Sequence, residues 1–170
     1  MQMRQIKFRG RRIDYQVWPD SPNIQWVHGL YFTAPLTDEN SGMNADAGWY
    51  FLSGGERKHC IVQDGTSFVV DPDTVGEWTG LRDSKRTVEF PEGQDVYEDD
   101  IVRVTDDIGD SSIYRVEYQG AQNYPAFDLV PDPGYDSNAL SWALAMYRVE
   151  VIGNVHDTPE LLEAHDETVG

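Results

Sequence analysis

Two blocks of sequence decide the fold: VDPDTVGEWTGL at residues 70–81 and VYEDDIVRV at residues 96–104. In the first block, Pro72 fixes its own φ and biases Asp71 toward extended geometry. This pattern is typical of a turn that leads into a strand. The second block places a tight acidic turn before an apolar/polar alternation, which predicts a second strand. Together the two blocks are the expected beginning of a small β-barrel.

Within the first block, the hydroxyl of Thr74 is expected to cap a single helical turn. Gly76 then permits a sharp exit from the turn, and Gly80 permits a second bend. Trp78 lies between them on the first predicted strand, and its polar neighbours point to the opposite face. Its size favours a buried position, and the alternative is an exposed Trp78 that anchors a binding partner.

Within the second block, Ile101 faces one side of the predicted strand, whereas Val102 and Val104 face the other. The turn before it contains Tyr97 and Asp99 in the sequence YEDD at residues 97–100.

These blocks resemble the central signature of the YopX-like proteins of phages and prophages. Residues 4–9 (RQIKFR) resemble the opening strand of that family, and residues 151–162 (VIGNVHDTPELL) resemble its closing strand and tail. Residues 34–48 and 85–91 look like insertions, and Asp99 stands where the family usually has glycine. The resemblance implies an SH3-like β-barrel portion and a phage origin, and it implies no activity. The residues that form the predicted structural signature are Asp71, Pro72, Thr74, Gly76, Trp78, Gly80, Tyr97, Asp100, Gly153 and Asn154.

The chain as a whole is predicted to be mainly β, in three parts. Residues 1–70 are expected to form an N-terminal antiparallel β portion, and residues 71–157 an SH3-like barrel. Residues 158–170 are expected to form a short C-terminal helix or tail that Thr158 caps. The expected strands are residues 5–9, 14–18, 24–33, 48–52, 59–62 and 67–70, then strands near 75, 101, 113–118, 126–130 and 147–155, with a short helix at 139–146. Asp64-Gly65, between the strands at 59–62 and 67–70, predicts a hairpin.

The net charge and the cysteine content indicate which partners and which cellular compartment to expect for the protein. Thirty acidic residues against thirteen basic ones give a formal net charge of −17, which repels nucleic-acid phosphates and anionic membranes. Direct binding of nucleic acid or of a membrane is therefore not expected. Cys60 is the single cysteine, so no intrachain disulfide forms and a reducing compartment is expected. With no apolar signal sequence or spanning segment, the predicted location is the cytoplasm of a bacterial host.

Motifs for catalysis, cofactors or metal ions are not found in the sequence. His59 and Cys60 are adjacent, so on a strand they point to opposite faces and are poorly placed to chelate one ion. Cys60 with a remote histidine is a conceivable dyad, but a cysteine in an apolar strand is more often simply buried. The acidic segment at residues 106–110 lacks EF-hand spacing and is predicted to be a hairpin loop. The sequence therefore predicts no enzyme, no cofactor and no metal.

Aromatic residues gather in the first part of the chain. They are typical of a core or a subunit interface, and less often of a groove for peptide or nucleic acid. The leading hypothesis is thus a non-enzymatic, self-associating interaction module, a homo-oligomer that also has a host protein as a possible partner. The alternative is an acidic decoy that imitates the phosphates of DNA and occupies a host nucleic-acid-binding protein. The aromatic residues are Trp26, Tyr31, Phe32, Trp49, Tyr50 and Phe51.

Overall fold

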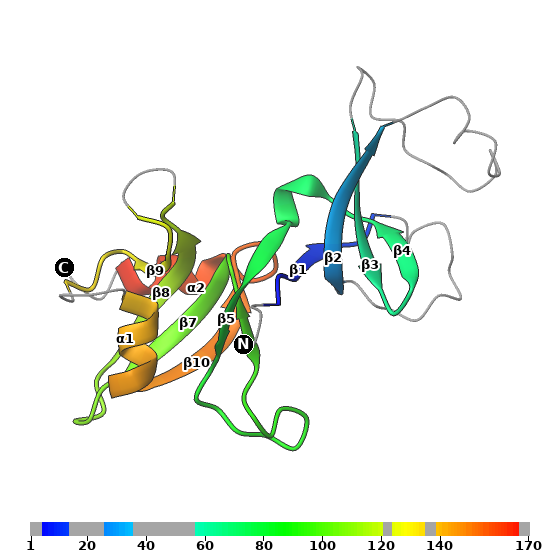
Figure 1. The fold of residues 1–170 in the computed structure, drawn as a ribbon. Coiled ribbons are helices and arrows are strands. Elements are labelled where there is room, and N and C mark those ends of the chain that lie inside the picture. Colours follow the sequence, from blue (N-terminus) through cyan, green and yellow to red (C-terminus); the bar gives the residue numbers. More distant parts are fainter. Residues whose placement is uncertain (1–4, 14–25, 36–56, 121–123, 135–138, 167–170) are drawn as a thin grey trace. The chain divides into compact units, whose positions relative to one another are not determined.

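The computed structural model describes residues 5–13, 26–35, 57–120, 124–134 and 139–166, and within them the protein is mainly β (Figure 1). Two compact units divide between Glu77 and Trp78, inside strand β5 (Gly76–Arg82). The predicted boundary between residues 70 and 71 lies in the turn before this strand. The strands expected at 14–18 and 48–52, and the aromatic residues Trp49, Tyr50 and Phe51, lie outside the described residues.

The N-terminal unit contains the first four strands of a six-stranded antiparallel sheet with the order β4-β3-β2-β1-β5-β6, in which β6 is Asp95–Tyr97. The elements of this unit are β1 (Phe8–Arg11), β2 (Trp26–Pro35), β3 (Arg57–Gln63), β4 (Thr66–Val69) and the 3₁₀ helix η3 (Pro72–Thr74). Asp64 and Gly65 join β3 to β4 with φ values of 50° and 80°. Positive φ at both central residues is what a tight Asp-Gly hairpin requires, so this predicted hairpin is confirmed.

This sheet curls back on itself. An isolated bridge pairs Arg12 with Val70, which connects the end of β1 to the residue that follows β4. Next to it, the Ile13 N–H donates to the Val69 carbonyl (3.1 Å). The enclosed core consists of Val27, Ile61 and Val70, with Phe8, Tyr31, Phe68 and Val75 packed against it.

The C-terminal unit contains a four-stranded antiparallel sheet with the order β10-β7-β8-β9. Its strands are β7 (Asp100–Thr105), β8 (Ser111–Tyr118), β9 (Phe127–Val130) and β10 (Arg148–Asn154), and β6 (Asp95–Tyr97) pairs with β5. The helices are α1 (Ala139–Met146) and α2 (Glu160–Asp166), and no described helix is long and apolar enough to cross a bilayer. The core is formed by Val96, Val102, Val104, Val116, Phe127, Leu129, Leu140, Ala143 and Val149.

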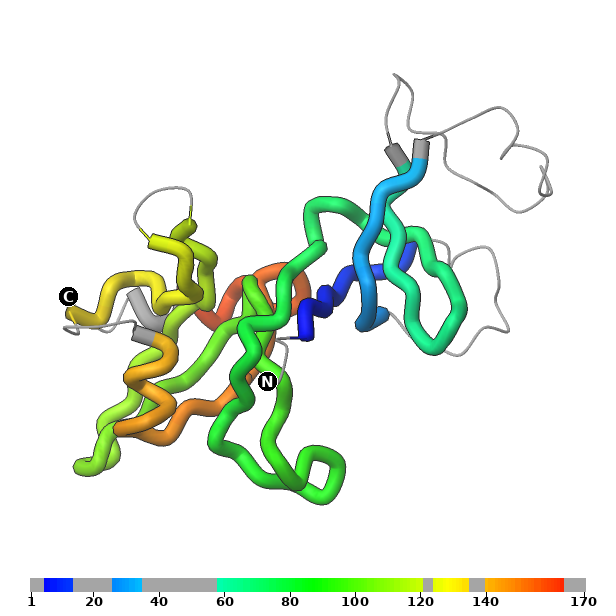
Figure 2. The backbone as a smooth tube through the Cα atoms, viewed as in Figure 1, coloured from blue at the N-terminus to red at the C-terminus, as the bar shows by residue number. Residues whose placement is uncertain are grey.

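The predicted SH3-like barrel is only partly matched, because the described strands do not pair into a closed ring. Strands β9 and β10 are the two edges of the four-stranded sheet, and α1 connects them and packs on both (Figures 1 and 2). Leu140 and Ala143 of this helix are fully buried, so a helix fills the space that a strand pair would close. Just after β5, the Ser84 N–H donates to the Val149 carbonyl of β10 (2.7 Å). This single backbone hydrogen bond joins the end of β5 to β10.

We expect Leu140→Ala to destabilise the protein, because it opens a cavity in the core beneath α1. The expected loss in the free energy of unfolding is about 2–5 kcal/mol, measured by urea denaturation. Met146→Ala is the matched control, since Met146 lies on the same helix and is 55% exposed, whereas Leu140 is 0% exposed. Equal losses for the two variants would contradict the assigned core.

Candidate functional site

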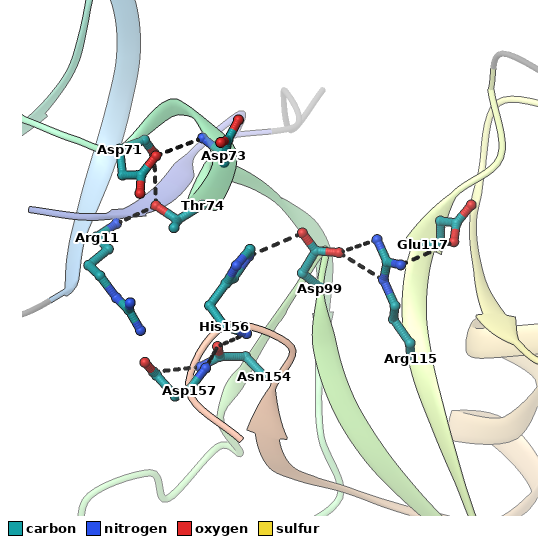
Figure 3. Close-up of polar contacts among 10 residues, drawn as sticks. All are labelled: Arg11, Asp71, Asp73, Thr74, Asp99, Arg115, Glu117, Asn154, His156 and Asp157. Carbon is teal, nitrogen blue, oxygen red and sulfur yellow. Dashed lines mark hydrogen bonds and ion pairs between the residues drawn. The ribbon is translucent and has the colours of Figure 1, made fainter. Parts of the chain in front are cut away.

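The turn before β5 is built around the buried side chain of Thr74. Asp71 is the N-cap of η3, and its Oδ1 accepts a bond from the Asp73 N–H (3.1 Å). The Thr74 hydroxyl donates to the Asp71 carbonyl (2.8 Å) and accepts from the Arg11 N–H (2.9 Å) (Figure 3). The helical turn is therefore present, but the prediction that Thr74 caps it is wrong. The cap is Asp71, and Thr74 instead ties the turn to β1.

The glycines and the tryptophan of the first block lie along β5. Gly76 is buried opposite Arg9 of β1, whereas Gly80 has φ +85° and lies where the β5–β6 register shifts. Gly80 thus forms the sharp bend that was expected at both glycines. Trp78 pairs with Tyr97 of β6 and is half-buried, and its Nε1 donates to the Leu81 carbonyl (3.3 Å). It is neither a fully buried core residue nor a fully exposed anchor.

The acidic turn between β6 and β7 contains two aspartates with different partners. Asp100 is 1% exposed, and its Oδ2 accepts from the Tyr97 N–H (2.7 Å), which closes the turn. Asp99 has φ 66°, a left-handed conformation that favours glycine. Its Oδ1 accepts from both Nε (2.9 Å) and Nη2 (2.7 Å) of Arg115 on β8, and its Oδ2 lies 3.3 Å from His156 Nε2 (Figure 3). This two-point ion pair explains why an aspartate is useful where glycine would fit more easily.

The closing block forms the turn from β10 into α2. Asn154 Oδ1 accepts from the N–H groups of His156 (2.9 Å) and Asp157 (3.0 Å). Asn154 also pairs with Asp100 across the sheet, so two signature residues that are far apart in sequence meet here. A Cβ on Gly153 would lie 2.0 Å from Thr158 Oγ1, so only glycine leaves room for the turn.

One residue that sequence reasoning did not identify, Asp83, is as well connected as any signature residue. It is 2% exposed. Its Oδ1 accepts from the N–H groups of Lys85 (3.2 Å) and Gln94 (2.9 Å), and its Oδ2 accepts from Val151 on β10 (3.1 Å). Gln94 and Val151 are distant in sequence, so no local pattern indicated this role.

The chemistry available in the described residues is limited. Tyr31 hydrogen-bonds to His59 Nδ1, and burial raises the pKa of the Tyr31 phenol above its ordinary value, with the charge of Cys60 acting in the same direction. A phenol with a raised pKa remains protonated and is a poor nucleophile. The described residues contain no group of three or more His, Cys, Asp or Glu residues placed to hold a metal ion. The polar groups of the signature mainly bond to backbone groups and to each other, which makes it a structural framework.

Comparison with protein families gives one match: the model described as YopX protein covers residues 38–163. Since this is most of the chain, the protein belongs to the YopX family. Searches of curated proteins and of solved structures found no match.

We expect Thr74→Val to destabilise the protein, because valine keeps the shape but removes the acceptor of the Arg11 N–H. An unsatisfied buried N–H costs about 1–3 kcal/mol, and thermal unfolding measures it. Thr74→Ser keeps the hydroxyl and is the control. If the valine and serine variants melt together, the hydroxyl has no such role.

We expect Asp99→Ala to be more destabilising than Asp99→Asn. Both remove the ion pair with Arg115, but alanine also pays the penalty of a left-handed backbone, roughly 1–2 kcal/mol, which asparagine tolerates. Asp99→Gly should resemble the asparagine variant. Urea denaturation of the three variants measures the order, and an alanine variant as stable as the other two would contradict it.

Proposed function

We propose that this YopX-family protein is a non-enzymatic, phage-type interaction module that self-associates in the cytoplasm of its host. The observation that carries the proposal is on β2, where Leu30 and Phe32 are 66% and 41% exposed. These residues are two apart on one strand, so their side chains lie on the same face. Val62 of β3 lies opposite Leu30 and is half-buried, whereas Cys60, opposite Phe32, is buried. We call Leu30, Phe32 and Val62 the β2 face.

The β2 face is the outer side of the curled sheet. Val27 and Tyr31 of the same strand alternate with it and point to the enclosed core. Single exposed apolar residues are ordinary on protein surfaces, but adjacent ones on one flat strand are typical of an interface. A large aromatic and a large aliphatic side chain are also the residue types that interface centres favour. A second copy of the chain supplies an identical apolar surface, and the symmetry of most oligomers pairs such surfaces with each other.

The acidic decoy remains the second candidate, and its support is the net charge of −17. Twenty of the thirty acidic residues lie at or after Trp78. Several of these carboxylates, however, are committed to internal bonds, namely those of Asp83, Asp99, Asp100 and Asp106. A carboxylate that is buried and hydrogen-bonded within the fold is not available to imitate a phosphate. The decoy reading therefore has less support than self-association.

We expect the wild-type protein at tens of micromolar to scatter light as a species larger than its 19.3 kDa chain. The double variant Leu30→Ser/Phe32→Ser should be monomeric and keep the circular dichroism spectrum of the folded protein, because both side chains are exposed. Ile108→Ser, at another exposed apolar residue (83%), is the control and should associate like the wild type. A monomeric wild type would contradict self-association. A double variant that still associates would show that the β2 face is not the interface.

A further inference from the structure

The loop that joins β5 to β6, residues 83–94, is far longer than its connection needs. Antiparallel neighbours are usually joined by about 2–5 residues. Here Arg82 and Asp95, the residues at the neck, already pair across the two strands and share an ion pair (Nε to Oδ1, 3.1 Å). The two strands are therefore already held together where the loop begins and ends. The loop itself extends away from the strand ends in Figure 1.

The loop is held in one conformation by its own hydrogen bonds. At the base, the buried carboxylate of Asp83 accepts from Lys85 and Gln94, and it also fastens the loop to Val151 of β10. Gly93 has φ +92° and packs so closely on Asp83 that a Cβ would lie 2.3 Å from its carbonyl oxygen. These contacts leave the base of the loop little freedom to rearrange.

The tip of the loop has its own turn. The Thr87 N–H donates to the Phe90 carbonyl (3.1 Å), and the Phe90 N–H donates back to the Thr87 hydroxyl (2.9 Å). Within this ordered turn the Val88 side chain is fully exposed (103%) and Phe90 is 38% exposed. Folding thus leaves the Val88 side chain entirely in water and the Phe90 side chain partly so. An ordered loop with an apolar tip has already lost the conformational entropy that binding would otherwise cost.

We infer that residues 83–94 form a docking loop whose Val88 and Phe90 enter an apolar pocket on a different protein, and that the rim of this pocket is basic. The charge of the tip supports this occupant. Glu89 lies between the two apolar residues and Glu92 follows them, and both are exposed. The basic residues of the loop, Lys85 and Arg86, are nearer its base, where Arg86 donates to the Asp83 carbonyl (2.7 Å). The carboxylates at the tip therefore complement a basic rim. A second copy of this chain, with its net charge of −17, is a poor source of a basic rim, whereas association through the β2 face pairs apolar side chains and needs no such rim.

Photo-crosslinking from the tip tests the inference with the full chain. Benzoylphenylalanine replaces Val88, and the protein is irradiated in a bacterial lysate; the same probe at Ile108 is the control, because Ile108 is exposed (83%) on another loop of the same unit. We expect an adduct with one protein from the Val88 position only. An adduct from both positions, an adduct only with a second copy of this chain, or no adduct overturns the docking loop.

The captured protein is then purified and its affinity is measured by calorimetry. We expect Val88→Ser/Phe90→Ser to weaken binding by at least about tenfold, Glu89→Gln/Glu92→Gln to weaken it and reduce its salt dependence, and Ile108→Ser to leave it unchanged. An unchanged affinity for the serine variant overturns the role of the apolar tip, and an unchanged affinity for the glutamine variant overturns the basic rim. The oligomeric state of the serine variant should match the wild type, so this test fails or succeeds independently of self-association through the β2 face.

Discussion

Carboxylates that accept backbone N–H groups are the interaction on which the C-terminal unit depends. Asp100 closes the turn into β7, and Asp83 joins the end of β5, the 83–94 loop and β10. Both are almost completely buried, where a charge without partners would be very costly. Each hydrogen bond to a charged group contributes roughly 1.5–3 kcal/mol, so the loss of either side chain would remove several strand connections at once.

Because these aspartates hold strands and turns together, the strongly acidic composition is not only a property of the surface. Part of the negative charge builds the fold, and Asp99 gives a second example by tying the acidic turn to Arg115 and lying close to His156. The family signature accordingly marks positions that shape turns and strand connections. The surfaces that we propose for partners lie elsewhere, on the β2 face and on the 83–94 loop, where large apolar side chains are exposed.

Much of the secondary structure could be predicted from the sequence because its causes are local. Alternation located β7 and β8, the Asp64-Gly65 pair located a hairpin, and the composition of residues 139–146 located α1. The closure of the sheets could not be predicted in this way. The bridge between Arg12 and Val70, and the bonds from Gln94 and Val151 to the Asp83 carboxylate, join residues far apart in the chain. Periodicity does not report such contacts, so a barrel was expected in the C-terminal part, whereas the bridge that brings β1 next to the end of β4 is in the N-terminal unit.

Amide hydrogen exchange, followed residue by residue by NMR, tests most directly the claim that buried carboxylates hold the C-terminal unit. The amides of Tyr97, Gln94 and Val151 are bonded to aspartate side chains, and we expect them to exchange as slowly as the central amides of β7. The exposed amides of Val88 and Glu89 provide the fast reference. If the three carboxylate-bonded amides exchange as fast as that reference, the carboxylates do not hold these strands and the account is wrong.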